Sequence, residues 1–362
     1  MEVSPIQSQS DILIKSHFND YQVSFIEDSP SVLEKIIRDG DVIIMDSVIR
    51  KLHPEVFQAI PLSNSMIDIT AHENQKSYQG LVPVIEKLVK SEFRKNHRLI
   101  AVGGGIVQDI TSFIASILYR GVNWIFFPTT LLAQGDSCIG SKTSINFGEY
   151  KNQIGGFYPP AKVYIDLGFL DTLSVADMQS GLGEMSHYFV VSGEKDFKRF
   201  KKDYYYALKE RGVLYKMISK SLAIKKRYIE IDEFDQNERQ VFNYGHSFGH
   251  AIESLTNYSV PHGIAVSFGM DMANYVSIRM NLLEPLVRQE ISELLQEIWQ
   301  GYDIKNLDVE DFLDALTKDK KNVGGELYLI LCKGYGKIIK TAVNNKESLK
   351  NWMMDYFENE LA

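Results

Sequence analysis

The sequence contains little cysteine: Cys138 and Cys332 are the two cysteines among its 362 residues. Two such residues cannot build the disulfide framework of a small secreted protein, and neither belongs to a Cys-x-x-Cys motif. The first residues also lack the basic segment and the apolar segment of a secretory signal peptide. We therefore expect a cytoplasmic protein that works in a reducing compartment.

The chain also lacks an excess of positive charge and a long hydrophobic run. It has 39 Lys and Arg residues against 47 Asp and Glu residues, a formal net charge of -8, which argues against nucleic acid or an anionic membrane as the main partner. Its most hydrophobic stretch lies between Asp109 and Arg120 and is shorter than the roughly 18 residues of a membrane span. We expect neither nucleic acid nor a membrane among the partners.

The chain does have the composition and patterning of a globular protein with two domains. Hydrophobic residues make up 44%, and 362 residues exceed the size at which one core usually stops growing. The first half alternates short apolar runs with amphipathic segments, which predicts a parallel sheet flanked by helices. The expected strands are residues 41–46, 99–103, 123–128 and 162–166. From about residue 176 helical periodicity dominates until a strand-like run at 326–332, so we place the boundary between Pro160 and Ser174.

Three glycines, Gly103 to Gly105, follow one expected strand and precede an expected helix. Glycine lets backbone amides approach a pyrophosphate, and a helix N-terminus favours negative charge. Any tight turn between a strand and a helix also uses glycine, and the Rossmann pattern Gly-x-Gly-x-x-Gly is absent. Asp46 ends another expected strand, where it would accept hydrogen bonds from ribose hydroxyls or would be a solvated turn residue.

A polar segment follows the expected strand at residues 123–128. Thr129 and Thr130 come directly after this strand, where their hydroxyls could reach a ligand. Arg120, Lys142 and Asn152 lie in a region rich in glycine that we interpret as loops. Cationic and amide donors of this kind bind a phosphate monoester, although each one taken alone also fits a solvated basic loop.

Three histidines lie close together in the second half of the chain. His246 and His250 are four residues apart, so they share one face of a helix, and His262 follows twelve residues later. Imidazole is the commonest ligand of a catalytic divalent metal, and such sites use three protein ligands. The alternative is a helix whose histidines cap it or fill the core.

These features belong to a longer ordered series that extends from about residue 41 to residue 336. The series consists of Asp46, Glu73 to Lys76, Gly103 to Asp109, Arg120, Pro128 to Ser137, Lys142, Lys151, Asn152, Glu184, Lys225, Arg239, Asn243, His246, His250, His262 and Asp319 to Lys321. It resembles the sugar phosphate cyclase family, and within that family most of all the 3-dehydroquinate synthases.

The resemblance implies a fold and an assembly. Residues 1–170 would form a Rossmann-like α/β domain that binds NAD, and residues 171–362 an all-α domain that binds metal and substrate, with the active site between them. Arg120 matches an arginine that reaches a substrate phosphate across a dimer interface, so a homodimer is expected.

The resemblance also implies the metal ligands. Glu184, His246 and His262 would bind a catalytic zinc ion, or cobalt in its place, and a carboxylate with two imidazoles leaves a position open for substrate. His250 would bind the substrate phosphate, although its spacing from His246 also suits a metal ligand.

The remaining site residues come from the same resemblance. The expected NAD-binding residues are Asp46, Glu73, Lys76, Gly103, Gly104, Gly105, Ile106, Asp109, Thr129, Thr130, Asp136, Ser137, Lys142, Lys151, Phe169, Thr172 and Leu173. The expected catalytic residues are Asp136, Lys142, His187, Lys225, Arg239, Asn243 and His250. Arg120, Asn152 and either Lys320 or Lys321 would bind substrate.

The implied reaction is the conversion of 3-deoxy-D-arabino-heptulosonate 7-phosphate to 3-dehydroquinate and phosphate, with NAD recycled, or the same chemistry on a related sugar phosphate. One position departs from the family, whose members usually have lysine three residues after the zinc glutamate, where this chain has His187. Histidine differs from lysine in charge and reach, so the substrate differs or another group supplies a proton. Two alternatives remain: an NAD- and metal-dependent polyol dehydrogenase of the same superfamily, and a non-catalytic homologue.

Overall fold

The computed structural model describes residues 11–361 except 59, 62, 149, 318–326 and 344. The chain divides into two compact units. Unit 1 comprises Met1–Ser174 and Lys225–Phe234, and unit 2 comprises Val175–Ile224 and Asp235–Ala362. Residues 225–234 therefore belong with the first part of the chain, although they lie far from it in sequence.

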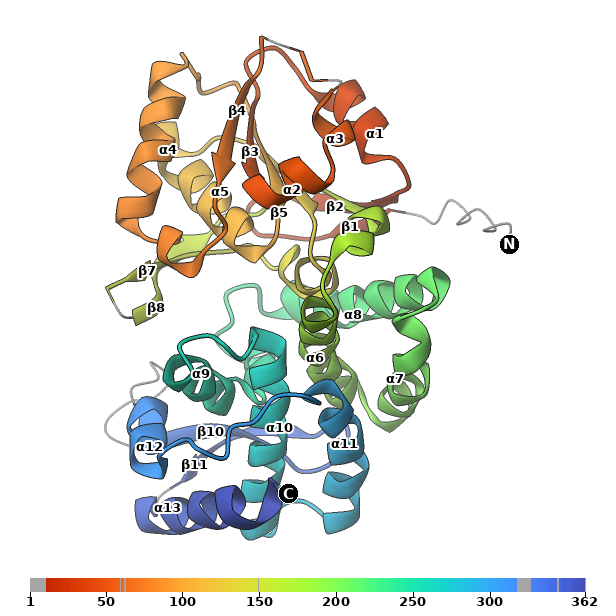
Figure 1. Cartoon of the computed structure of the whole chain (residues 1–362), viewed down its shortest axis with the longest axis vertical. Coiled ribbons are helices and arrows are strands. Elements are labelled where there is room, and N and C mark those ends of the chain that lie inside the picture. The colour runs from red at the N-terminus through yellow and green to blue at the C-terminus, as the bar shows by residue number, and fades with distance from the viewer. Residues whose placement is uncertain are drawn as a thin grey trace. The chain divides into compact units, whose positions relative to one another are not determined.

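Unit 1 is built on a seven-stranded sheet in the order β1-β2-β9-β6-β5-β3-β4, in which β1 pairs antiparallel with β2 and the other pairs are parallel. The strands are β1 (Ile12–Ile14), β2 (Tyr21–Ile26), β3 (Val42–Asp46), β4 (Ser65–Ile69), β5 (Leu99–Gly103), β6 (Trp124–Pro128) and β9 (Lys162–Asp166) (Figure 1). The four predicted strands are confirmed: two coincide with β5 and β9, and two begin one residue before β3 and β6.

Helices cover this sheet, as its apolar strands require, because a parallel sheet buries both faces. Ile43, Met45 and Val102 pack in a core that also holds residues of the first three helices, and α5 packs against β5 and β6. The helices of unit 1 are α1 (Ser29–Ile36), α2 (Ser47–Leu52), α3 (Glu55–Gln58), α4 (Tyr78–Lys90) and α5 (Gly105–Ile117). Short helical turns connect them: η1 (Glu73–Gln75), η2 (Leu118–Arg120), the π-helix η3 (Ala133–Ser137) and η4 (Leu167–Thr172).

The glycine-rich region after residue 140 is a β-hairpin, so its interpretation as loops was wrong. β7 (Lys142–Phe147) pairs antiparallel with β8 (Tyr150–Phe157), with Lys142 opposite Phe157. Glycine is what allows the close pairing: a Cβ on Gly155 would lie 1.9 Å from the carbonyl oxygen of Thr143. The glycines that suggested a loop therefore serve a pair of strands.

Unit 2 is mainly helical, as predicted, although it also contains strands and is therefore not all-α. Its helices are α6 (Val175–Ser192), α7 (Glu194–Ala207), most of α8 (Arg211–Ile231), α9 (His246–Leu255), α10 (His262–Arg279), α11 (Pro285–Ile298), α12 (Val309–Thr317) and α13 (Lys346–Asp355), with turns η5 (Glu238–Asn243) and η6 (Tyr356–Glu360). A small antiparallel sheet of β10 (Leu327–Cys332) and β11 (Ile338–Val343) lies with them (Figure 1). Among the helices that the structure describes, none combines the length and the apolar character needed to cross a bilayer.

Candidate active site

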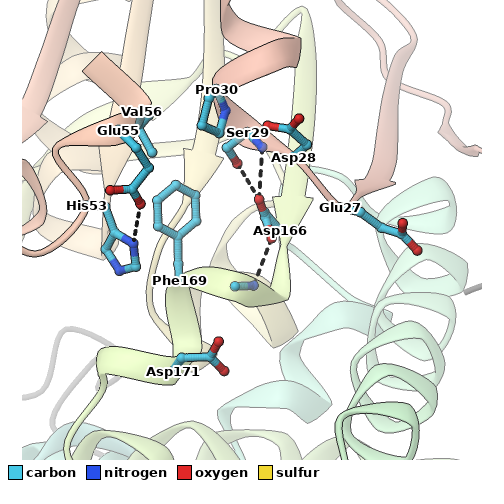
Figure 2. Close-up of a pocket in the computed structure, with 11 residues that line it drawn as sticks. Glu27, Asp28, Ser29, Pro30, His53, Glu55, Val56, Asp166, Phe169 and Asp171 are labelled. Atoms are coloured by element: carbon cyan, nitrogen blue, oxygen red, sulfur yellow. Dashed lines mark hydrogen bonds and ion pairs between the residues drawn. The ribbon is translucent and has the colours of Figure 1, made fainter. Parts of the chain in front are cut away.

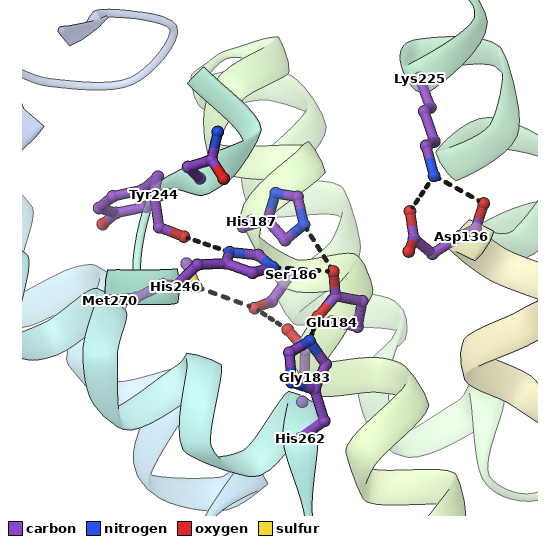
Figure 3. A network of polar contacts seen from close by, with 12 residues as sticks. Asp136, Gly183, Glu184, Ser186, His187, Lys225, Tyr244, His246, His262 and Met270 are labelled. Atoms are coloured by element: carbon purple, nitrogen blue, oxygen red, sulfur yellow. Dashed lines mark hydrogen bonds and ion pairs between the residues drawn. The ribbon is translucent and has the colours of Figure 1, made fainter. Parts of the chain in front are cut away.

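Three helices of unit 2 bring one carboxylate and two imidazoles together. Glu184 lies in the middle of α6, while His246 and His262 are the first residues of α9 and α10. The Nε2 atoms of His246 and His262 each lie 3.4 Å from a carboxylate oxygen of Glu184, Oε1 and Oε2 respectively. One donor atom from each of the three residues falls within 4.8 Å of the others. Figure 3 shows the rings and the carboxylate pointing toward one another.

Glycine allows α6 and α10 to approach this closely. A Cβ on Gly263, next to His262, would lie 1.8 Å from the carbonyl oxygen of Ser180, and a Cβ on Gly183, next to Glu184, would lie 2.3 Å from the carbonyl oxygen of Gly263. Any larger residue at either position would separate the two backbones. The metal-binding geometry thus depends on residues that carry no donor atom.

Backbone and side-chain acceptors fix the two imidazoles. Nδ1 of His246 lies 3.3 Å from the carbonyl oxygen of Tyr244, and Nδ1 of His262 lies 3.0 Å from Oε2 of Glu253. Because a carbonyl and a carboxylate only accept, each Nδ1 donates its proton, and each Nε2 is turned toward Glu184. Metal-binding histidines are commonly oriented in this way.

The charge state of Glu184 also suits a metal. Its side chain is buried, which opposes ionisation, but His246 and His187 hold the pKa of its carboxyl well below the usual range. Oε2 of Glu184 is buried and accepts no hydrogen bond from the described residues. A buried anionic oxygen in this situation is stabilised by a cation, so the three residues fit the divalent metal that the sequence suggested.

Of the other predicted residues of unit 2, His250 lies next to this group. The ring of His250 lies 5.6 Å from that of His246 and 5.8 Å from that of His262. Arg239 and Asn243 lie on η5, which ends two residues before α9, and Arg239 is buried. Lys320 and Lys321 fall outside the described residues.

In unit 1 the predicted glycine turn leads into the N-terminus of a helix. Gly103 ends β5 and α5 begins at Gly105, and the N-cap residue of this 13-residue helix, Gly104, has no side chain that could cap the first turn. Its free N–H groups and its dipole favour a phosphate. A Cβ on Gly104 would lie 2.9 Å from the side chain of Thr130, so the turn is kept open by glycine. These groups fit the pyrophosphate of a dinucleotide.

Several predicted NAD-binding residues lie at the same edge of the sheet, because β3, β5, β6 and β9 are parallel and end there. Asp46 ends β3, and burial raises the pKa of its carboxyl although Val48 donates a hydrogen bond to it. Thr129 follows β6, is buried, and its hydroxyl has no hydrogen-bond partner among the described residues. Phe169, Thr172 and Leu173 lie in or directly after η4, which follows β9.

A second group joins η1, α5 and the hairpin. Nζ of Lys76 lies 2.6 Å from Asp109, and burial raises the pKa of the Asp109 carboxyl while Lys76 lowers it. Nζ of Lys151 lies 3.9 Å from Glu73. Asn146 links these residues to Asn152: it donates to Glu73 at 2.8 Å and accepts from the backbone N–H of Asn152 at 2.9 Å.

The last group is the ion pair of Lys225 with Asp136. Nζ of Lys225 donates to Oδ1 of Asp136 at 2.6 Å and to its backbone carbonyl at 2.9 Å, and Lys225 is buried. Ser137, the next residue, donates to Gln108 on α5 at 2.6 Å. Figure 3 shows the contact of Lys225 with Asp136. The π-helix η3 therefore connects a predicted catalytic pair to the helix that begins at the glycine turn.

A cavity of about 330 Å³ lies in unit 1 beside the ends of β2 and β9 (Figure 2). Its lining includes five carboxylates, those of Glu27, Asp28, Glu55, Asp166 and Asp171. Negative charge on this scale disfavours a phosphate group. Phe169 lines the cavity. The ring of His53 contacts the ring of Phe169 edge-on, with 5.1 Å between the ring centroids, and Nε2 of His53 lies 2.9 Å from the hydroxyl of Thr172.

The sequence interpretation missed the residues that support the predicted ones. Glu253 lies seven residues after His246 and three after His250, so the helical periodicity of α9 was a usable signal. Asn146 gave no signal, because its role depends on the hairpin. Gly183 and Gly263 flank predicted ligands, but only the crossing of α6 and α10 explains them.

Comparison with known proteins agrees with these features. Family models described as the N-terminal and C-terminal parts of 3-dehydroquinate synthase match residues 66–180 and 181–322. The 3-dehydroquinate synthase of Dictyoglomus turgidum (strain DSM 6724 / Z-1310) is 36% identical over 342 residues, which cover 93% of this chain and 90% of the relative.

Two solved structures share the fold. 2-Epi-5-epi-valiolone synthase from Streptomyces hygroscopicus subsp. jinggangensis 5008, with NAD+ and Zn2+ bound, has a TM-score of 0.86 at 21% identity and covers 99% of both chains. 2-Deoxy-scyllo-inosose synthase, complexed with carbaglucose-6-phosphate, NAD+ and Co2+, has a TM-score of 0.81 at 22% identity and covers 96% of this chain and 99% of its own. The expected family and fold are confirmed: the chain belongs to the 3-dehydroquinate synthase family.

Proposed function

We propose that the protein is an NAD- and divalent-metal-dependent sugar phosphate cyclase, a carbon–oxygen lyase of the 3-dehydroquinate synthase type. The observation that carries the proposal is the convergence of Glu184, His246 and His262 around a buried carboxylate oxygen that accepts no hydrogen bond from the described residues. The proposed reaction converts 3-deoxy-D-arabino-heptulosonate 7-phosphate to 3-dehydroquinate and phosphate, a step of the shikimate pathway, in the cytoplasm.

The cofactors define the chemistry that the residues serve. When bound, the metal polarises a secondary alcohol of the substrate, and NAD accepts its hydride and later returns it. Glu184, His246 and His262 would hold the metal, while the first turn of α5 and the residues that end β3 and β6 would hold NAD. Zinc is the proposed metal, because a carboxylate with two imidazoles is a common catalytic zinc set.

Basic and amide side chains would bind the acidic groups of the substrate. Arg239 is buried, and its planar guanidinium is suited to bind a carboxylate through two hydrogen bonds. The substrate phosphate and hydroxyl groups would be bound by Lys142, Asn152, Asn243 and His250. Lys225, held by Asp136 at 2.6 Å, has a fixed ammonium group that can donate to substrate. Fixing the substrate in one conformer supplies a large part of such catalysis.

A homodimer is part of the proposal. Arg120 and the preceding Tyr119 adopt left-handed backbone conformations, with φ of 61° and 50°, which non-glycine residues rarely keep without a constraint. Apolar side chains are exposed nearby in the sequence and on α4, among them Val82, Val89 and Ile117. These observations support a surface that packs against a second copy of the chain. In such a dimer Arg120 would reach the substrate phosphate bound by that second copy.

The test compares phosphate release with NADH formation. Purified protein, zinc, the heptulosonate phosphate and substoichiometric NAD should release many phosphates per NAD without growth of NADH absorbance. A polyol dehydrogenase would instead accumulate NADH in step with product, and a non-catalytic homologue would release no phosphate. His246→Ala and His262→Ala serve as controls that should lose both metal and phosphate release.

A further inference from the structure

His187 occupies a position that is closed to solvent and directed at a metal ligand. It lies on α6 three residues after Glu184, and therefore on the same face of the helix. Its Nε2 lies 3.1 Å from Oε1 of Glu184, and the side chain is completely buried (Figure 3). The contact uses one oxygen of the carboxylate, while Oε2 accepts no hydrogen bond from the described residues.

Aromatic side chains enclose the His187 ring. The ring of Tyr188 lies 4.0 Å away, that of Phe242 5.8 Å away, and that of His246 5.3 Å away and almost perpendicular. A ring enclosed in this way on a helix has little freedom to change its orientation. His187 is therefore held in the position from which it contacts Glu184.

The three converging residues then show a common arrangement. His246 has the carbonyl oxygen of Tyr244 behind it, and His262 has the carboxylate of Glu253. Glu184 has the imidazole of His187 at Oε1, the oxygen that also lies 3.4 Å from Nε2 of His246. In metal sites, partners of this kind orient the ligands, and removing one typically lowers metal affinity by about ten-fold to a hundred-fold.

We propose that His187 is a positioning residue: its Nε2–H donates to Oε1 of Glu184 and thereby directs Oε2 to the metal. This inference rests on the proposed function, and it differs from the expectation that residue 187 contacts a substrate hydroxyl. The imidazole of His187 acts on the metal through Glu184, so this chain uses the position of the family's lysine to support the metal site.

Direct metal titration in the absence of substrate tests the proposal. His187→Met keeps the approximate volume and removes the donor, while His187→Gln places an amide N–H near the position of Nε2. The titration uses zinc in competition with a chromogenic chelator, and the visible spectrum of the cobalt-loaded protein reports the ligand geometry. Ser186→Ala is the matched control, because Ser186 is the buried neighbour on α6 and donates to the carbonyl of Gly183 at 2.6 Å.

His187→Met should bind zinc about ten-fold to a hundred-fold more weakly than the parent and should alter the cobalt spectrum. His187→Gln should recover most of the affinity, and Ser186→Ala should match the parent. Circular dichroism of the metal-free proteins checks folding, and His187→Ala repeats the comparison if the methionine variant is unfolded. If folded His187→Met or His187→Ala binds zinc within two-fold of the parent, the inference about His187 is overturned but the proposed function is not. If the parent itself binds no metal, the proposed function is overturned as well.

Discussion

Glu253 accepts a hydrogen bond from His262, with 3.0 Å between Oε2 and Nδ1. Glu253 is buried on α9, while His262 begins α10, so this side-chain contact links the two helices that carry the imidazoles. The Nε2 atom of His262 is thereby directed at Glu184. The two residues show that the site is built from supporting contacts as much as from the ligands themselves.

The first prediction concerns this contact. Glu253→Ala should weaken zinc binding about ten-fold to a hundred-fold, because His262 loses the acceptor that fixes its tautomer and orientation. Glu253→Gln, whose amide oxygen still accepts, should lose less. Chelator competition measures both, with Glu293→Gln as the control, since Glu293 is an exposed glutamate paired with Lys201. Unchanged affinity in both Glu253 variants would show that His262 is oriented by other groups.

The second prediction concerns the close crossing of α6 and α10. Gly263→Ala should lower the free energy of unfolding by about 1 to 3 kcal/mol or more, since its Cβ would lie 1.8 Å from the carbonyl oxygen of Ser180. Gly212→Ala on α8 is the control, because a Cβ there meets no atom within 4 Å. Urea unfolding of the metal-free proteins measures the effect. Equal stability of the two variants would mean that the helices separate without cost.

The third prediction concerns pH. Burial raises the pKa of Glu233, but hydrogen bonds from Ser141, from the backbone of His17 and from Ser16 outweigh burial and lower it below the usual value. A lowered folded pKa means that this carboxylate stabilises the fold above its unfolded pKa and that the stabilisation is lost as pH falls through the folded pKa.

Glu233→Gln should therefore lose less stability than the parent between about pH 6 and about pH 3, while the parent should be the more stable at neutral pH. Urea unfolding across this range measures both proteins. Glu34→Gln, at an exposed position on α1, should follow the parent. Parallel profiles for the parent and Glu233→Gln would mean that the hydrogen bonds do not favour the ionised form.

The parts of the fold that the sequence predicted are those fixed by local pattern. The run that became β5 is buried throughout, and the run that became β9 buries Val163, Ile165 and Asp166. Such runs have few alternatives in a parallel sheet. The β7–β8 hairpin was missed because Gly155 and Gly156 suggested a loop. The close strand pairing that requires glycine at position 155 arises only when β7 and β8 come together in the fold. Local pattern does not report which backbones will touch.

The same limit applies to the site. Helical spacing paired His246 with His250, and the structure does hold their rings 5.6 Å apart. The convergence of Glu184, His246 and His262 depends on the packing of α6 against α9 and α10, which follow each other in sequence but lie far from α6 in the chain. The resemblance to a family supplied that grouping, and the physical reason for it, the glycine contact between α6 and α10, is visible only in the folded chain.

The most direct test of the central claim follows the hydride. The heptulosonate phosphate is prepared with deuterium on the carbon whose hydroxyl is oxidised, and it is turned over with unlabelled NAD and zinc. We predict that the cyclised product keeps the deuterium while NADH does not accumulate, because one turnover both removes and returns the hydride. If deuterium instead collects in NADH while an oxidised product without the label forms at the same rate, the hydride is not returned and the proposed cyclase function is contradicted.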